Sequence, residues 1–262
     1  MSASNSVKGI DCVGRTVLVT GAGSGLGRSM ALALAAAGAE IVAAVRRPET
    51  GVSVVEEITA AGGSAIWVRC DVRVLEDITA AVDQTVEHFG KLDVMIHNAT
   101  GPASAEIGTL DELDEDFWED IAGHNLRAAF RFARAAHPHL KQSQGTMILL
   151  TSGIAVEGKA IQPEYGAAKA GIRALTKSLA AEWGPDGINV NCLSPAGMTP
   201  AYERVFEQDP TWGEHIRQTV PLGRVGDPLV DIAPVVVFMA SAACQFITGQ
   251  TITATGGRTM LL

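Results

Sequence analysis

Three side chains near the middle of the chain have the types and the spacing of proton-transfer machinery. Ser152 ends an apolar run, Tyr165 lies 13 residues later, and Lys169 lies four residues beyond the tyrosine. Positions i and i+4 share one face of a helix, so the Lys169 ammonium is expected beside the Tyr165 phenol. Because a nearby cation favours the phenolate, the pKa of Tyr165 is expected to fall below its ordinary value of about 10. These residues could therefore transfer a proton near neutral pH, although a lone Tyr-x-x-x-Lys is more often a packed ring beside a solvated lysine.

A glycine-rich stretch lies near the start of the chain. Residues 20–27 read Thr-Gly-Ala-Gly-Ser-Gly-Leu-Gly and stand between the first predicted strand and the first predicted helix. Glycine permits a tight turn and a close approach of the backbone, so a pyrophosphate can bind the amides at the positive end of a helix. A structural turn would use the same glycines, but the position of the loop favours a dinucleotide site. The candidate contacts are Gly21, Ser24, Gly25, Leu26 and Gly27.

The end of the second predicted strand bears on the choice of cofactor. A carboxylate at that point would bond both hydroxyls of the adenine ribose and would repel a 2′-phosphate. This chain has Val45 there, followed by Arg46 and Arg47, which predicts NADP(H) rather than NAD(H). The alternative is that both arginines are a solvated strand end. Asp71, just past the third predicted strand, could accept from the adenine amino group or cap the next helix.

Apolar, β-branched runs alternate with amphipathic helical patterns along the whole chain. Strands are predicted at 16–20, 40–45, 65–69, 92–97, 146–151, 188–193 and 251–253, and helices at 25–37, 51–61, 75–89, 115–140, 164–182 and 228–240. Nearly continuous apolar strands that alternate with helices indicate a parallel sheet covered on both faces. We therefore predict an α/β fold, a doubly wound parallel sheet in a single domain over residues 1–262, with a flexible tail at 1–9. The proline-punctuated segment 195–227 departs from this rhythm and is expected to form a lid over the ligand crevice.

Composition argues against several classes of partner. Lys and Arg total 20 against 29 Asp and Glu, a formal net charge of −9, which offers no basic surface for nucleic acid. The start of the chain lacks the pattern of a signal peptide, and no later apolar run is long enough to cross a bilayer, so no membrane partner and a cytoplasmic location are expected. The four cysteines have no zinc or CxxC spacing, so we expect reduced thiols and no metal.

Together these motifs resemble the short-chain dehydrogenase/reductase family, in the form that includes 3-oxoacyl-ACP reductase-like carbonyl reductases. The resemblance covers the chain from about Arg15 to Gly257. It combines the glycine loop, Asp71, the pair Asn98-Ala99, Asn125, Ser152, Tyr165 with Lys169, and a proline-containing segment at 194–200. It implies a seven-stranded Rossmann sheet, hydride transfer between a nicotinamide and a carbonyl or alcohol carbon, and a homotetramer or homodimer.

The resemblance also implies roles for individual residues. Tyr165 would be the general acid or base, Ser152 would stabilise the substrate oxygen, and Lys169 would bind the nicotinamide ribose. Asn125 would hold a water in a proton relay from Lys169. Further cofactor contacts are implied at Val72, Asn98, Pro195 and Thr199.

The residues around the predicted site suggest a substrate. Its wall is expected to consist of Ile154, Val156, Gln162, Met198, Tyr202 and Phe206, with Trp212 nearby. This mainly apolar and aromatic lining predicts a medium-sized, largely apolar ketone, aldehyde or secondary alcohol, because the lid has no cluster of Arg or Lys. Local core packing would also explain these residues, and reduction of a β-ketoacyl thioester remains open.

Three stretches depart from the family pattern. Residues 97–101 read His-Asn-Ala-Thr-Gly, so His97 could replace an amide that ties strands together. Residues 195–197 read Pro-Ala-Gly, which puts the nicotinamide contacts near Thr199 in doubt. Residues 255–257 read Thr-Gly-Gly, which we expect to affect a subunit interface or the sheet edge rather than catalysis. An NAD-dependent alcohol or diol dehydrogenase and a non-catalytic NADPH-binding sensor are the alternative functions, and a nucleotide-sugar epimerase is less favoured because the chain has no large C-terminal substrate domain.

Overall fold

Seven parallel strands form one sheet. The computed structural model describes residues 9–101, 104, 106, 108–200, 202–203, 207 and 211–261. The strand order is β3-β2-β1-β4-β5-β6-β7, so the direction of winding reverses between β1 and β4. Open α/β sheets bind ligands at the carboxyl ends of the strands beside such a reversal. The strands are β1 (Thr16–Thr20), β2 (Glu40–Val45), β3 (Ser64–Arg69), β4 (Val94–His97), β5 (Thr146–Leu150), β6 (Asn189–Pro195) and β7 (Thr251–Ala254).

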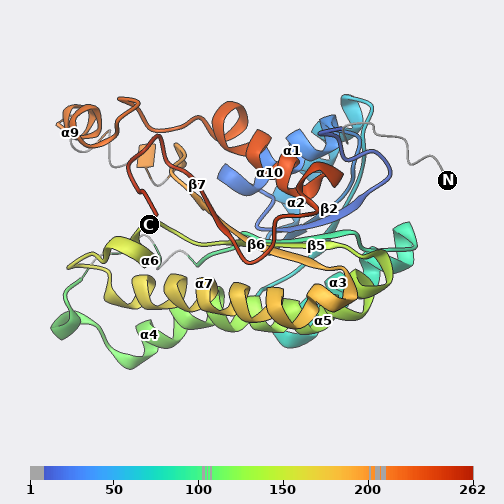
Figure 1. The fold of residues 1–262 in the computed structure, drawn as a ribbon, viewed down its shortest axis with the longest axis horizontal. Helices are drawn as coiled ribbons and strands as arrows, with labels where there is room; N and C mark the ends of the chain where they lie inside the picture. Colours follow the sequence, from blue (N-terminus) through green and yellow to red (C-terminus); the bar gives the residue numbers. More distant parts are fainter. Residues whose placement is uncertain are drawn as a thin grey trace.

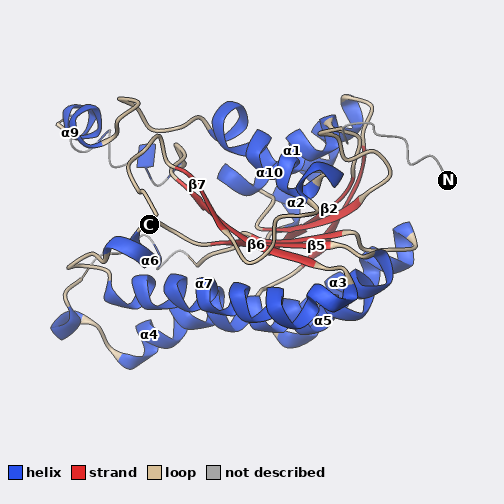
Figure 2. Cartoon of the chain, in the orientation of Figure 1, coloured by secondary structure: helices blue, strands red, loops and turns tan. Residues whose placement is uncertain are grey.

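Helices cover both faces of the sheet, as the alternation of apolar runs predicts. Figure 1 shows α1, α2 and α10 on one face and α3, α5 and α7 on the other, and Figure 2 shows the sheet between these two layers. Each layer has its own apolar core, with Met30 and Leu34 in the first and Phe132 and Leu140 in the second. The six helices are α1 (Gly25–Ala36), α2 (Pro48–Ala60), α3 (Leu75–Phe89), α5 (Ala128–Ser143), α7 (Pro163–Trp183) and α10 (Ala233–Ala240).

Shorter helical pieces lie between these elements. The α-helical ones are α4 (Glu115–Ala122), α6 (Ile154–Glu157) and α9 (Trp212–Thr219). The 3₁₀ turns are η2 (Leu110–Glu112), η4 (Gly184–Asp186) and η6 (Ala242–Cys244), and the π-helical turns are η3 (Gly123–Arg127) and η5 (Pro228–Ile232).

The predicted helix at 115–140 is helical throughout, but it contains a π turn. This turn, η3, lies between α4 and α5. Within this turn the side-chain Nδ2 of Asn125 donates to the Ile121 carbonyl at 2.9 Å, which takes over an acceptor that a regular helix would give to a backbone amide. A π turn of this kind is often found at a functional site. The predicted helix at 228–240 also begins as a π turn before α10.

The segment predicted as a lid leaves and rejoins the sheet region at one place. The Met198 amide donates to the Gly226 carbonyl at 2.7 Å, and the Gly226 amide donates to the Ala196 carbonyl at 3.0 Å. Between these contacts the described residues include α9, which Figure 1 places at the same end of the molecule as α6 and the C-terminus. Phe206 lies outside the described residues, and movement of this segment as a lid stays a prediction.

The cysteines are dispersed through the interior. Cys12, Cys70, Cys192 and Cys244 are all buried and form no disulfide with one another. Within the described ranges, no group of three His, Cys, Asp or Glu side chains is arranged to hold a metal ion. The helices of the same described part include none that is long and apolar enough to span a membrane.

Candidate active site

The loop from β1 to α1 is shaped by glycines. Gly21 and Gly25 have φ values of 67° and 52°, in the left-handed region that favours glycine. A Cβ atom added to Gly27 would lie 2.2 Å from the Gly21 carbonyl oxygen, so only glycine fits there. Ser24 is the N-cap of α1, and its side chain makes no capping bond. The first turn of α1 therefore has no side-chain cap from Ser24, and binding of a pyrophosphate by the amides around Ser24 and Leu26 stays a prediction.

The end of β2 lies beside this loop. A Cβ atom on Gly23 would lie 3.3 Å from a Val45 methyl carbon, so Val45 packs directly against the glycine turn. Arg46 and Arg47 follow and are exposed, and the Arg47 Nε is 3.8 Å from the Glu49 carboxylate. These arginines therefore lie where the adenine ribose of a dinucleotide would be bound.

The residues after β3 are fixed by local bonds. Asp71 accepts from the Arg73 backbone amide at 3.0 Å and pairs with its guanidinium at 3.3 Å. Burial alone would raise the pKa of Asp71, but the hydrogen bonds and charge of Arg73 outweigh it and leave the pKa below its ordinary value. The alternative that Asp71 caps the next helix is wrong, because Val74 is the N-cap of α3. Val72 is buried beside it.

The serine, tyrosine and lysine come together after β5. Ser152 leads from the carboxyl end of β5 into α6, while Tyr165 and Lys169 lie one turn apart on α7. The Lys169 ammonium is buried, lies 5.4 Å from the centre of the Tyr165 ring, and donates to the Leu150 carbonyl at 2.8 Å. The shared face expected from the four-residue spacing is therefore present.

The expected lowering of the Tyr165 pKa is wrong in this structure. Burial raises the pKa of Tyr165 to about 12, and the neighbouring Tyr202 adds to the rise. Lys169 does not reverse this effect, because its ammonium lies over the ring and is committed to the Leu150 carbonyl. Burial also lowers the pKa of Lys169 to about 8. At neutral pH Tyr165 is consequently protonated, as a donor to a carbonyl oxygen must be.

Asn125 is fully buried in the π turn η3. Its side-chain carbonyl accepts from the Thr100 hydroxyl at 3.3 Å, in addition to the bond from its amide to Ile121. Its backbone carbonyl lies 3.2 Å from His97 Nε2. Because a carbonyl only accepts, His97 Nε2 must carry the proton in this contact.

His97 links this turn to the nucleotide loop. The Thr20 hydroxyl oxygen accepts from the amides of Asn98 and Ala99, both at 3.0 Å, so its own proton is left for His97 Nδ1 at 3.2 Å. Asn98 also donates from its side chain to the Thr20 carbonyl at 3.0 Å. Burial, followed by the charge of Lys169, lowers the pKa of His97 to about 3, which keeps the ring neutral. His97 therefore takes the place expected of an amide that ties strands together.

The predicted substrate residues have different surroundings. Gln162 donates to the carbonyls of Ser104 and Glu106, at 3.4 and 3.1 Å, so its amide positions the segment after β4. Thr199 accepts from the Tyr202 amide at 3.4 Å. Val156 is exposed, whereas Ile154, Pro195, Met198 and Tyr202 are partly buried.

Two charged residues that contact this predicted wall belong to none of the motifs found in the sequence. Lys159 donates to Gln162 Oε1 at 3.1 Å, and Arg258 donates to the Tyr202 hydroxyl at 3.3 Å. The Thr-Gly-Gly stretch begins where the edge strand β7 ends, which agrees with the expected place at the sheet edge. The turn that it forms brings Arg258 to Tyr202, and only the fold reveals this contact.

Comparison with known proteins agrees with this geometry. The family profile described as enoyl-(acyl carrier protein) reductase matches residues 21–259. The chain belongs to the short-chain dehydrogenase/reductase family. Among its relatives in this family is the 3-oxoacyl-(acyl-carrier-protein) reductase FabG of Chlamydia pneumoniae, which is 33% identical over 251 residues, 95% of this chain and 99% of the relative.

Solved structures of this dehydrogenase family show the same fold. A 7α-hydroxysteroid dehydrogenase in complex with NADH and 7-oxo glycochenodeoxycholic acid has a TM-score of 0.88 and 29% identity, over 95% of each chain. A protein described as an NAD(P)-dependent gluconate 5-dehydrogenase from Beutenbergia cavernae, with bound NADP, has a TM-score of 0.87 and 30% identity, over 95% of this chain and 98% of that one. The protein is thus an oxidoreductase of alcohols or ketones that uses a nicotinamide cofactor.

The neutral, buried His97 makes stability sensitive to acid. In the unfolded chain this histidine binds a proton below a pKa of about 6.5, but in the folded protein it does so only near 3. The unfolded state therefore binds more protons between these values, and the free energy of unfolding falls as pH falls. Asn can accept from Thr20 and donate to the Asn125 carbonyl, so His97→Asn should fold and lose this sensitivity. Between pH 7.5 and 5.5, we expect wild type to lose about 1.4 kcal/mol more than the variant in urea unfolding. Equal losses would contradict the assigned protonation state.

Proposed function

We propose that the protein is an NADP(H)-dependent oxidoreductase that transfers a hydride between the nicotinamide and a carbonyl or secondary alcohol carbon. The observation that carries this proposal is the arrangement of Ser152, Tyr165 and Lys169 at the carboxyl end of β5, on the same edge of the sheet as the glycine loop after β1. Its four proposed catalytic residues, with Asn125 as the fourth, are all within the described part of the chain.

In reduction, the cofactor supplies the hydride and the protein supplies the proton. Tyr165, protonated at neutral pH, would donate to the oxygen that becomes an alkoxide. The Ser152 hydroxyl would donate a hydrogen bond to the same oxygen as its charge develops. Lys169 would bind the nicotinamide ribose, and the Asn125 carbonyl, oriented by His97, would hold the water that returns a proton toward Lys169. Oxidation of an alcohol would use the same groups in reverse.

The cofactor would lie across the carboxyl ends of the strands. The amides at Ser24, Gly25 and Leu26 would bind the pyrophosphate, and Arg46 with Arg47 would bind a 2′-phosphate. Asp71, Val72 and Asn98 border the adenine and ribose region, and Pro195 with Thr199 borders the nicotinamide. A Cβ atom on Gly25 would lie 3.6 Å from the Pro200 ring, so the segment after β6 passes close to the glycine loop.

The substrate is proposed to be a medium-sized carbonyl compound or secondary alcohol with an apolar body. Partly buried Ile154, Met198 and Tyr202 support this proposal. Two of the similar proteins carry acids in their descriptions, 7-oxo glycochenodeoxycholic acid and gluconate, so an acidic group on the substrate is compatible with this family. A β-ketoacyl thioester, suggested by the relative FabG, remains a candidate within the same chemistry.

The catalytic assignment predicts a separation of binding from turnover. Tyr165→Phe should keep the affinity for NADPH but lose roughly 10²- to 10⁴-fold in kcat, because the proton donor is removed. Ser152→Ala should lose about 10²-fold, since its bond strengthens as the alkoxide forms. Absorbance at 340 nm follows turnover, and fluorescence titration follows NADPH binding. An unchanged kcat in Tyr165→Phe would refute the mechanism, and tight NADPH binding without turnover of any carbonyl would favour a sensor.

The cofactor assignment predicts a selective loss. Replacing both Arg46 and Arg47 by Ala should lower kcat/KM for NADPH by about 10- to 100-fold, the value of one or two charge-assisted hydrogen bonds, and leave NADH nearly unaffected. Arg134→Ala, an exposed arginine on α5, is the matched control and should change neither value. A wild-type preference for NADH would favour an NAD-dependent alcohol or diol dehydrogenase instead.

We also propose that copies of this chain assemble through α7. Four alanines spaced along one side of this helix are exposed and therefore do not pack against the sheet: Ala167, Ala170, Ala174 and Ala181. Exposed Trp118 on α4 and Phe130 on α5 extend this apolar surface along the helices that lie beside α7 in Figure 1. Small side chains allow two such helices to approach closely across a homotetramer or homodimer interface.

A charged side chain in this interface should disrupt it. We expect Ala170→Glu with Ala174→Glu to reduce the molecular mass measured by light scattering after size-exclusion chromatography, because the new carboxylates would be buried without partners. Ala60→Glu, an exposed alanine on α2 across the sheet, should leave the mass unchanged. A wild-type monomer, or an assembly that tolerates both substitutions, would contradict the proposed interface.

A further inference from the structure

Two positively charged side chains contact neighbours of the proposed catalytic tyrosine. Lys159 donates to Gln162, and Arg258 donates to the Tyr202 hydroxyl. Gln162 immediately precedes the helix that carries Tyr165, and the Tyr202 hydroxyl is near enough to raise the pKa of the Tyr165 phenol. Each cation is therefore one residue removed from Tyr165, through Gln162 or Tyr202.

The two cations also lie near each other. Burial lowers the pKa of Lys159, and the charge of Arg258 lowers it further. Like charges repel, so this arrangement costs free energy that a bound anion would recover. Among the described residues, neither Lys159 nor Arg258 forms an ion pair with a carboxylate, and their side chains instead donate to the uncharged Gln162 and Tyr202.

The turn that carries Arg258 is held by hydrogen bonds within residues 255–259. The Thr255 hydroxyl accepts from the Thr259 amide at 3.2 Å, and the Arg258 amide donates to the Thr255 carbonyl at 3.2 Å. Gly256 and Gly257 supply φ values of 62° and 86°, which close the turn. Arg258 is thus presented by an ordered turn.

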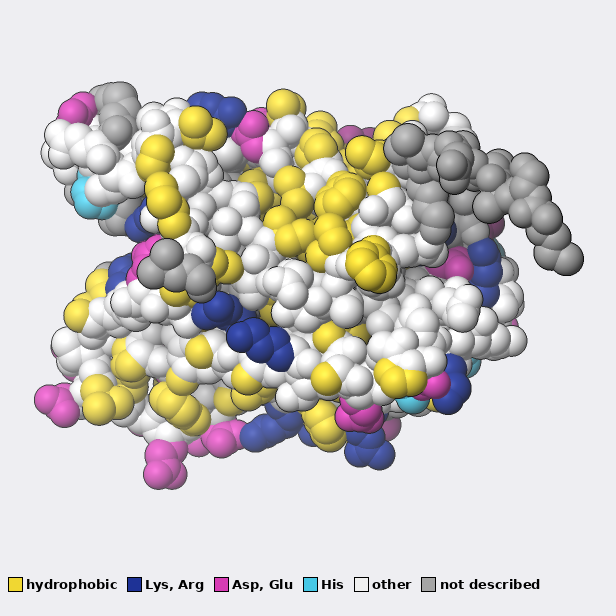
Figure 3. Space-filling view, in the orientation of Figure 1, with side chains coloured by type: hydrophobic (Ala, Val, Ile, Leu, Met, Phe, Trp, Pro, Cys, Tyr) yellow, Lys and Arg dark blue, Asp and Glu magenta, His cyan; other side chains and the backbone are white. Residues whose placement is uncertain are grey.

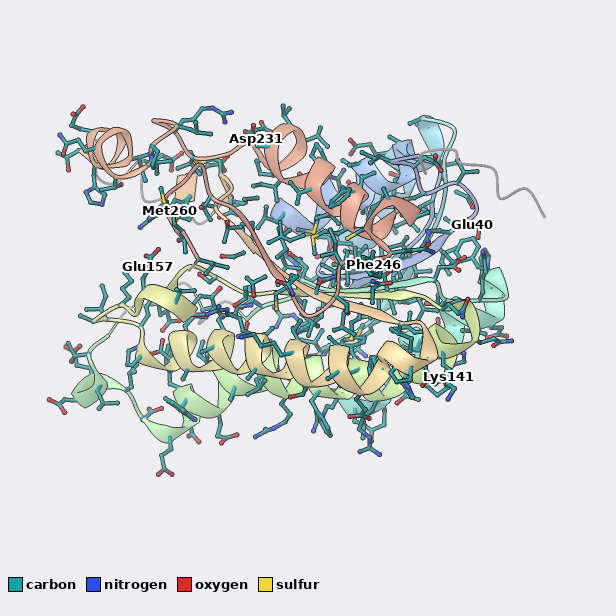
Figure 4. All side chains as sticks on the ribbon, viewed as in Figure 1. Glu40, Lys141, Glu157, Asp231, Phe246 and Met260 are labelled. Carbon is teal, nitrogen blue, oxygen red and sulfur yellow. The ribbon has the colours of Figure 1, made fainter. Side chains whose placement is uncertain are left out.

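The same turn lies against the start of α6. A Cβ atom on Gly153, the residue after Ser152, would lie 2.3 Å from the Thr259 hydroxyl oxygen. It would also lie 3.6 Å from the carboxylate of Glu157, the last residue of the short helix α6. Figure 4 shows Glu157 and Met260 at this end of the molecule. The turn that carries Arg258 therefore packs beside the residue that follows Ser152, with one exposed acid, Glu157, nearby.

We propose that Lys159 and Arg258 bind a carboxylate of the substrate whose carbonyl or alcohol carbon reacts at Tyr165. This inference rests on the proposed oxidoreductase function and specifies its substrate class as an oxo acid or hydroxy acid with an apolar body. A guanidinium donates two parallel hydrogen bonds to a carboxylate, and an ammonium adds a third from another direction. The apolar residues of the wall would contact the body of the molecule, and the two cations would fix which end faces Tyr165.

Matched substrates test this proposal. The probes are 4-oxocyclohexanecarboxylate and straight-chain oxo acids of four to ten carbons, each compared with its methyl ester at equal NADPH. We expect wild type to prefer at least one acid over its ester by about tenfold or more in kcat/KM, the value of a charge-assisted hydrogen bond. Arg258→Gln and Lys159→Gln should each remove most of this preference by lowering the value for the acid alone. Arg258→Lys should retain part of it, and Lys91→Gln, at the amino ends of the strands, should retain all of it.

Each outcome decides the proposal. Equal kcat/KM values for every acid and its ester in wild type would overturn it. Equal losses of kcat/KM for acid and ester in Arg258→Gln would also overturn it, because they would indicate a structural role for Arg258. If no probe is reduced at all, the proposed function fails on these substrates, and calorimetry of acid binding to the NADPH-loaded Tyr165→Phe protein decides the anion site separately. The site is supported if the acid binds, its ester does not, and the affinity for the acid falls about tenfold when Arg258→Gln is combined with Tyr165→Phe. No binding, or binding that ignores Arg258, refutes it.

Discussion

The hydroxyl of Thr20 is the interaction on which the arrangement of this site depends. It accepts two backbone amides from the chain that follows β4 and gives its own proton to His97. His97 in turn donates to the backbone carbonyl of Asn125. One buried oxygen therefore joins the glycine loop, the end of the central strand β4 and the π turn before α5. These hydrogen bonds use the Thr20 hydroxyl and both ring nitrogens of His97. If Thr20, His97 or Asn125 moved, a buried polar group would be left unpaired, which costs about 1 to 3 kcal/mol.

The two apolar layers give this network its rigidity. The ring of His97 lies 5.6 Å from that of Phe132, a fully buried residue in the core between the sheet and α5. On the opposite face, the apolar surface visible in Figure 3 lies over α10 and the loop that carries Phe246, labelled in Figure 4. The sheet is thus fixed between two cores, and the groups at its carboxyl edge inherit their positions from strands that cannot shift in register without exposing one of these faces.

Local sequence patterns were sufficient for the fold and for the adjacent positions of Tyr165 and Lys169 on one helix. Strands that are apolar on both faces leave a long continuous signal, and Tyr165 and Lys169 meet because four residues span one helical turn. The pattern did not show the π turn at Asn125, because the residues on both sides of it are helical. It also could not give the pKa of Tyr165, because that pKa depends on burial and on the electrostatic interaction with Tyr202, a residue that the fold alone brings close. The same limit applies to Arg258, whose approach requires the turn after β7.

Burial and charge together favour a particular protonation state for catalysis. A phenol whose pKa is about 12 and an ammonium whose pKa is about 8 are both protonated at neutral pH, the state in which Tyr165 can donate a proton to a carbonyl. A carboxylate placed near the phenol would raise its pKa further, because negative charge disfavours phenolate. The cations at Lys159 and Arg258 would offset that effect by neutralising the carboxylate where it binds. In this arrangement the charge that orients the substrate need not disturb the acid that reacts with it.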